Sequence, residues 1–133
     1  MLAITAKSPY AVSALAELAL TGGSTPVSIG ELAKRRDIPA QFLEGLFATL
    51  RRAGVLQSQR GVKGGYSFAR PPEEVTVLEV VELLEGELDS DPAAKREVWR
   101  DAVGAVRDVL GAVTIAEIAE REQRAAGARM YQI

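Results

Sequence analysis

The chain has 133 residues, of which 47% are apolar and 26% are charged, and these proportions are typical of one ordinary globular domain. It contains no cysteine and no histidine, which excludes disulfides, thiolate ligation of zinc or iron–sulfur clusters, and catalytic triads built on histidine. No apolar run approaches the roughly 20 residues of a membrane-spanning helix. We therefore expect a cytoplasmic protein that is not an enzyme, uses no metal or cofactor, and has no membrane partner.

The charges are divided unequally along the chain. Residues 1–70 carry nine basic and four acidic side chains, a net charge of +5, whereas residues 71–133 carry seven basic and fourteen acidic ones, a net charge of −7. A basic half joined to an acidic half is typical of a protein that binds a polyanion with one face. Ordinary solvated surface charge is the alternative explanation.

Capping residues mark where most helices begin. Hydroxyl residues stand three positions before a glutamate at Ser28, Thr76 and Thr114, and each pattern predicts a capping box. Ser8 followed by proline predicts a further helix start, with Ser8 as its N-cap. Together with apolar spacing and terminating glycines, these signals predict helices over 8–20, 28–36, 76–85 and 93–111, another between Pro39 and Gly54, a last short helix from 114, and a mobile segment over 123–128.

A glycine-rich loop separates two short segments that have strand character. Residues 55–59 and 66–69 predict the strands, and residues 60–65 predict the loop between them. The order of helix, turn, helix and hairpin is that of a winged helix-turn-helix. The fold class expected is therefore mainly α with a small β-hairpin, a winged helix-turn-helix joined to a long dimerisation helix.

The second helix of such a pair fits the major groove of DNA, and its first turn points side chains at base edges. Gln41 could contact adenine with two hydrogen bonds and Glu44 could accept one from cytosine, while cations at the helix end and in the loop would contact phosphates. Alternatively, Gln41 and Glu44 only solvate the helix, and the loop is a plain hairpin turn. The candidate DNA-binding residues are Ser28, Pro39, Ala40, Gln41, Glu44, Arg51, Arg52, Arg60, Lys63, Gly64, Gly65 and Tyr66.

Two other kinds of site are disfavoured by spacing. A phosphate-binding loop of the Walker type needs lysine and a hydroxyl residue after its last glycine, but Tyr66 follows Gly65 here. Acidic residues alternate from Glu85 to Asp91, but they lack the glycine and the twelfth-position glutamate of an EF-hand. We interpret this segment as a solvated connector.

The helix predicted over 93–111 is the longest, and its apolar residues form one stripe. The stripe predicts a two-fold dimer seam, because the chain offers few other elements that could bury a helix of this length. Packing on its own domain is the alternative. The candidate dimer residues are Trp99, Val103, Val106 and Leu110, and the expected division is a DNA-binding domain over 1–75, dimerisation and regulatory helices over 76–122, and a mobile tail over 123–133.

The stretches Phe42–Leu56 and Arg60–Pro71 resemble the BadM/IscR-like (Rrf2) family of winged-helix regulators, and the likeness extends from Thr5 through Gly86. The resemblance implies a homodimeric transcription factor that binds a double-stranded DNA operator. Members that sense iron–sulfur clusters carry three cysteines in the segment matching roughly Gly86 to Val98, and this chain has none there. Cluster sensing is therefore not implied.

The carboxy-terminal part, from Asp91–Trp99 through Val106–Leu110, is similar to that of the cysteine-metabolism repressors of this family. Those repressors end in an aromatic residue and a terminal isoleucine, and they work with cysteine synthase. The resemblance implies a repressor of cysteine and sulfur metabolism genes whose tail could enter the enzyme's cleft, because an isoleucine carboxylate is similar to the amino-acid end of a substrate. The candidate partner-binding residues are Met130, Tyr131, Gln132 and Ile133.

Several functions stay open on the sequence. The tail could be frayed and without a role. The protein could be a regulator of the same fold that answers a small molecule or a redox signal through a pocket near Trp99. It could also be an interaction adaptor that has the fold without operator binding.

Overall fold

The computed structural model of the chain describes residues 4–21 and 25–131. These residues form a mainly helical structure with one two-stranded antiparallel sheet. The fold class predicted from the sequence is confirmed. The elements in chain order are α1 (Lys7–Thr21), α2 (Ile29–Arg36), α3 (Ala40–Arg52), β1 (Leu56–Gln59), β2 (Gly65–Phe68), the 3-10 turn η1 (Pro72–Glu74), α4 (Val77–Glu85), the 3-10 turn η2 (Pro92–Lys95), α5 (Glu97–Gly111) and α6 (Ile115–Tyr131).

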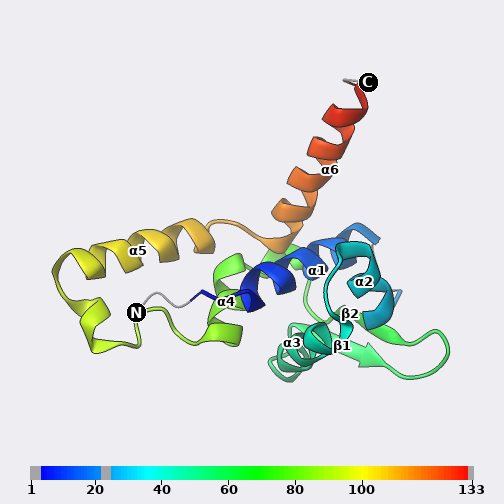
Figure 1. Cartoon of the computed structure of the whole chain (residues 1–133), viewed down its shortest axis with the longest axis horizontal. Coiled ribbons are helices and arrows are strands. Elements are labelled where there is room, and N and C mark those ends of the chain that lie inside the picture. Colours follow the sequence, from blue (N-terminus) through cyan, green and yellow to red (C-terminus); the bar gives the residue numbers. More distant parts are fainter. Residues whose placement is uncertain (1–3, 22–24, 132–133) are drawn as a thin grey trace.

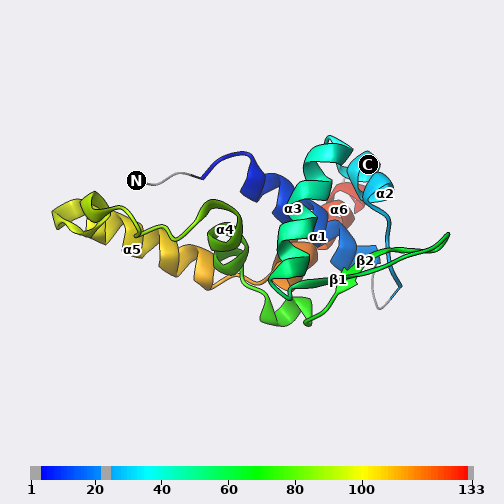
Figure 2. The ribbon, with the colours of Figure 1, turned by 90° about the horizontal axis from the view of Figure 1, so that it is seen from below.

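Figure 1 shows an elongated molecule with three parts. Helices α1, α2 and α3 and the hairpin form the body, α5 extends from it at the end opposite the hairpin, and the carboxy-terminal half of α6 stands away from it. The view from below in Figure 2 confirms that the hairpin and α5 occupy opposite ends. None of the described helices has both the length and the apolar character needed to cross a membrane.

The main core lies where α1 and α3 meet, and the largest side chains that are wholly buried there are Phe47, Leu15, Leu32, Leu43 and Leu50. Burying each such side chain contributes about 1.5–3 kcal/mol, so this cluster carries much of the stability of the body. Helix α4 and the start of α6 add Val80 and Ile115 to the same core. The body therefore includes elements from beyond residue 75.

A second, smaller cluster joins α4 to α5 and consists of Val81, Leu88, Ala94 and Val103. Arg107 of α5 also forms an ion pair with Glu82 of α4. Helix α4 thus has two apolar faces, one in each cluster, and it connects α5 to the body.

Three of the four predicted hydroxyl caps, those at Ser28, Thr76 and Thr114, are confirmed. The hydroxyl of Ser28 accepts the N–H of Glu31 at 3.2 Å, and Thr76 and Thr114 accept the equivalent N–H groups of Glu79 and Glu117 at 3.1 Å. These bonds satisfy amide groups that the first turn of a helix leaves without partners.

The predicted cap at Ser8 is wrong. Ser8 lies inside α1, and its hydroxyl donates instead to Glu85 Oε2 at 2.7 Å, while the Thr5 hydroxyl accepts the N–H of Lys7 at 3.2 Å. A carboxylate is stabilised near the positive amino-terminal end of a helix, and Glu85 occupies that place at α1. This charged acceptor draws the Ser8 hydroxyl away from the backbone.

Two other boundaries differ from the prediction. The helix expected over 93–111 is divided at Arg96, whose backbone is extended, because the separate turn η2 places Ala94 in the second cluster with 1% exposure. The segment expected to be mobile from residue 123 is helical, and α6 continues to Tyr131. Alanine and arginine favour a helix there, and no proline interrupts it.

Candidate nucleic-acid interface

Backbone hydrogen bonds and one buried side chain fix the turn between α2 and α3. Asp37 ends α2 in the left-handed conformation at φ 54°, its N–H donates to the carbonyl of Ala33, and Ile38 donates to the same carbonyl at 2.9 Å. The Ile38 side chain is buried at 5% exposure. This closure sets the direction in which Pro39 starts α3 and so orients the helix that would enter the groove.

Helix α3 has one face in the core and one in solvent. Leu43, Leu46, Phe47 and Leu50 are buried, so the opposite face points outward. The candidates on this outward side and at the helix start are all exposed: Pro39, Ala40, Gln41, Glu44, Arg51 and Arg52. The structure therefore places the predicted base-reading and phosphate-contacting residues of α3 on one accessible surface.

The hairpin that follows is a two-stranded wing extended by one bridging residue. Strands β1 and β2 pair in antiparallel register with Leu56 opposite Phe68, and Val27 bonds to Tyr66 as an isolated bridge through N–O distances of 2.9 and 2.8 Å. The sequence did not indicate Val27 as a wing residue, since one bridging residue leaves no alternating pattern. The bridge fixes the wing to the segment that leads into α2.

Gly64 and Gly65 belong to the wing for steric reasons. A Cβ at Gly65 would lie 2.3 Å from the carbonyl oxygen of Val27, and one at Gly64 would lie 2.2 Å from that of Gln59. Backbone atoms cannot yield at such distances, so both positions require glycine. Close approach of the backbone therefore explains why glycine occupies these two positions of the candidate site.

The tip of the wing presents two cations. Arg60 and Lys63 are exposed, and Val62 between them is fully exposed. Gly61, at φ 116°, forms the turn by accepting the N–H of Gly64 at 3.0 Å. Arg51 at the end of α3 reaches β1, where it donates to the Ser58 hydroxyl at 3.5 Å.

The cations of α3 and the wing differ from other arginines of the chain in whether they form ion pairs with glutamates. Within the part of the chain that the structure describes, five arginines form ion pairs with glutamates: Arg35, Arg36, Arg70, Arg107 and Arg121. A hydrogen bond that Arg70 donates to Glu79 raises the pKa of Arg70, and the bonds that Arg36 donates to Glu122 raise the pKa of Arg36 against the effect of burial. Among residues 4–21 and 25–131, no such pair involves the four cations of α3 and the wing, which are Arg51, Arg52, Arg60 and Lys63.

Two predicted DNA-binding residues have structural tasks. The Ser28 hydroxyl is used as the cap of α2, although the residue is exposed. The Tyr66 ring packs edge-on against Phe47, with ring centroids 5.3 Å apart, and lies against the main core. Phe42, a residue of the apolar pattern of α3, is 37% exposed and contacts Tyr10 in the same edge-on manner.

The predicted dimer stripe on α5 is only partly exposed. Val103 was predicted at the dimer interface, but it is 2% exposed and packs in the second cluster of its own chain, as the alternative of packing on its own domain requires. Val106 and Leu110 lie partly against that cluster, and Trp99 is 51% exposed. Val98 and Val109, which the predicted stripe did not include, are 61% and 65% exposed. The place of Val103 was missed because α5 has two apolar faces, and only tertiary packing decides which of them is covered.

The four predicted partner-binding residues fall at the limit of the described structure. The backbone of α6 includes Met130 and Tyr131, while their side chains and the whole of Gln132 and Ile133 lie outside the described residues.

A wing beside an exposed helix, both carrying cations that no carboxylate pairs with in the part of the chain that the structure describes, is typical of a winged-helix DNA-binding protein. The chain matches the Rrf2 family, described as iron-dependent transcriptional regulators, over residues 4–121. CymR of Bacillus subtilis is 32% identical over 136 residues, which cover 98% of this chain and 99% of that protein. The chain belongs to the Rrf2 family of transcriptional regulators, as its resemblance predicted, and it is therefore a regulator and not an enzyme.

Solved structures agree with this assignment. The structure of B. subtilis CymR, described as the global cysteine regulator of that organism, is 33% identical, with a TM-score of 0.79, and the match covers 91% of this chain and 98% of that one. The structure of T. potens IscR is 35% identical, with a TM-score of 0.80, and the match covers 93% and 90%.

The description of the family refers to iron, which needs particular ligand atoms from the protein. Iron–sulfur clusters are bound by cysteine thiolates, sometimes with histidine, and this sequence contains neither residue. Among residues 4–21 and 25–131, no group of three acidic residues is arranged to hold an ion. The residues present do not fit a cluster.

Proposed function

We propose that this protein is a homodimeric repressor that acts in the cytoplasm, with α3 in the major groove of its operator and the wing against the adjacent backbone. The observation that carries the proposal is the surface formed by α3 and the wing. Its four cations have no carboxylate partners in the described structure, and Gln41 and Glu44 stand exposed beside them. Cations that no carboxylate neutralises are suited to phosphates, while amide and carboxylate groups on a helix start are suited to base edges.

The spacing on α5 supports the dimer. Val98, Ala102, Ala105 and Val109 follow one another at steps of four, three and four residues, which is the period of a coiled-coil seam. A shallow hollow of about 230 Å³ lies on this helix, lined only by Ala105, Val106, Val109 and Leu110. Two copies related by a two-fold axis along this stripe would present their wings to half-sites about one DNA turn, ~34 Å, apart.

DNA binding is tested by salt dependence. A duplex selected by the wild-type protein from a random library serves as the probe, and its affinity is measured at several salt concentrations. Lys63→Ala and Arg60→Ala should weaken binding to every sequence alike and reduce the salt slope by about one unit each. Lys95→Ala is the control, because Lys95 is an exposed cation on η2, at the α5 end of the molecule.

Three results would contradict this assignment. Equal slopes for Lys63→Ala and the wild type would remove the wing from the interface. A changed sequence preference without a changed slope would give Lys63 a base-reading role instead. Weak affinity that does not depend on sequence would favour an interaction adaptor.

The regulated genes and the partner form the finer part of the proposal. We infer repression of cysteine and sulfur metabolism genes, with cysteine synthase bound through residues 130–133. Similarity to B. subtilis CymR over nearly the whole of both chains supports this inference. Calorimetry with the host's cysteine synthase tests it: micromolar or tighter binding should be lost when Ile133 is removed. Absence of binding by either form would leave the DNA-binding assignment in place and remove the cysteine assignment.

A further inference from the structure

The side chain of Arg36, at the last position of α2, connects three helices. Its Nε donates to Glu17 of α1 at 2.9 Å, and its two terminal nitrogens donate to both carboxylate oxygens of Glu122 on α6, at 3.1 and 2.7 Å. It also reaches the Ser13 hydroxyl at 3.4 Å. The side chain is 17% exposed, so its charge is mostly screened from water by these partners. A paired guanidinium in this position is a fixed contact and differs from a solvated surface charge.

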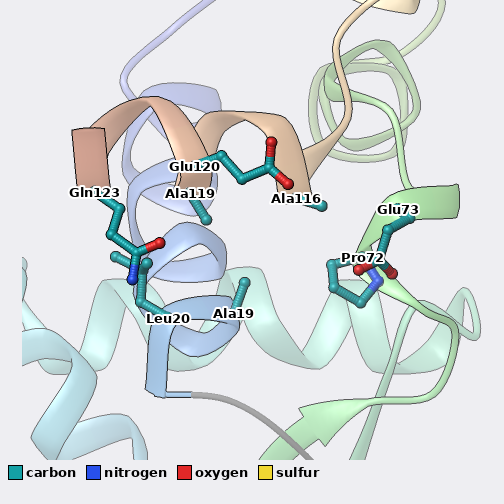
Figure 3. A pocket seen from close by; sticks show the side chains of 8 residues that line it. All are labelled: Ala19, Leu20, Pro72, Glu73, Ala116, Ala119, Glu120 and Gln123. Carbon is teal, nitrogen blue, oxygen red and sulfur yellow. The ribbon is translucent and has the colours of Figure 1, made fainter. Parts of the chain in front are cut away.

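Apolar residues make the rest of the contact between α1 and α6. Ile115 and Ala119 are the buried apolar residues of α6. Beside them lies a hollow of about 190 Å³. Figure 3 shows the residues of α1, η1 and α6 that line this hollow: Ala19, Leu20, Pro72, Glu73, Ala116, Ala119, Glu120 and Gln123. Glu122 lies one turn beyond Ala119, so its bidentate pair with Arg36 adds a directed contact that fixes α6 beyond its first turn.

Arg36 is also the residue before the turn that aims α3. Asp37 and Ile38 close that turn on Ala33, and α3 begins two residues later. Glu17 accepts from Arg35 as well, at 3.3 Å, so consecutive cations of α2 share one carboxylate of α1. A change in where α6 lies would therefore act on the end of α2, and through the closed turn on the start of α3.

We propose that Arg36 is a positioning residue through which α6 holds the helix-turn-helix in the orientation that binds DNA. The docking of α6 on Arg36 then sets operator affinity. Arg36 does not itself contact phosphate, because its guanidinium nitrogens are directed to Glu17, Glu122 and Ser13. The proposal rests on the DNA-binding face described under the proposed function.

The test compares two substitutions that remove the same charge from the same helix. Glu122→Gln removes the charge and one of the two acceptors that Arg36 uses, whereas Glu117→Gln weakens only the exposed pair that Glu117 forms with Arg121 within α6, at 3.2 Å. Affinity for the selected duplex should fall three- to tenfold for Glu122→Gln and stay within twofold of wild type for Glu117→Gln. The salt slope and the preferred sequence should not change, because no DNA contact is lost. Glu122→Asp, which keeps the charge, should recover part of the affinity.

A double-substitution cycle tests whether Arg36 and Glu122 affect operator affinity through their shared contact. Arg36→Gln together with Glu122→Gln should lose little more affinity than the more severe single variant, because both remove one contact. Affinities are measured well below the thermal midpoint of every variant. A lower midpoint with unchanged affinity would show a purely structural role and overturn the proposal, as would a reduced salt slope for Arg36→Gln. A wild-type protein that selects no duplex would overturn the proposed function, whereas equal affinities of Glu122→Gln and wild type would overturn only the role of Arg36.

Discussion

Replacing Gly65 by alanine should separate the wing from the body. Gly65 has a φ of 153°, which side chains rarely adopt, and an added Cβ would lie 2.3 Å and 2.4 Å from the carbonyl oxygen and carbon of Val27 and 2.7 Å from the amide nitrogen of Ser28. All three are backbone atoms, so relief requires the chain before α2 to move away from β2. The bridge between Val27 and Tyr66 would then break.

The cost follows from what is lost. The bridge consists of two backbone hydrogen bonds of 2.9 and 2.8 Å, each contributing about 1 kcal/mol to stability. The unfavourable φ adds about 1–2 kcal/mol for a residue with a side chain. We therefore expect Gly65→Ala to lower the free energy of unfolding by about 3–4 kcal/mol, as the sum of these contributions.

Urea denaturation followed by circular dichroism measures this loss. Gly45→Ala is the control, because Gly45 lies inside α3 with nothing within 4 Å of an added Cβ. That substitution should stabilise the protein by about 0.5–1 kcal/mol, since alanine favours helix over glycine. A Gly65→Ala variant that loses less than about 1 kcal/mol, the contribution of one hydrogen bond, would refute the argument that the bridge requires glycine.

Three further predictions concern base reading, assembly and acid stability. Gln41→Ala should relax specificity at one base step by about 1–3 kcal/mol in a binding-site selection, and an unchanged preference would assign Gln41 to helix solvation. Val109→Lys should weaken self-association at least tenfold in sedimentation experiments, because it places like charges across the proposed seam, whereas Val62→Lys at the more exposed wing tip should not. Partial burial raises the pKa of the Glu85 carboxyl, but hydrogen bonds from Ser8 and Thr5 outweigh it and hold that pKa below 4.5, its ordinary value. Since the folded pKa is lowered, this carboxylate stabilises the fold fully above pH 4.5 and ceases to do so as the pH falls through the folded value. Urea titrations should therefore show a smaller loss of stability below pH 4.5 for Glu85→Gln than for the wild type, and equal losses would contradict the assigned hydrogen bonds.

Local signals in the sequence were reliable where neighbours along the chain decide the outcome. Ser28, Thr76 and Thr114 cap their helices as predicted, because a capping bond joins residues three positions apart. The hairpin was placed correctly for the same reason, since glycines in the loop and strand-forming residues beside it specify a turn locally.

Signals that depend on distant partners failed or were absent. The Ser8 hydroxyl bonds to Glu85, 77 residues away, and Val103 of the predicted surface stripe is covered by α4. Nothing near Val27 in the sequence indicates its bridge to the wing, and nothing near Arg36 indicates its contact with α6.

One local signal was also misread. The α6 segment from residue 123 was interpreted as a mobile tail, although its own residues favour a helix.

The sequence by itself determined the order of elements, the outward cations of α3 and the wing, and membership of the family, because these depend on local propensity, charge and short motifs. Only the tertiary structure decided which face of α5 stays exposed, why Gly64 and Gly65 cannot carry side chains, and which arginines are neutralised by glutamates. Those properties arise when segments far apart in the chain are brought within a few ångströms. Contact and charge pairing at that range depend on the packed fold and not on any one stretch of residues.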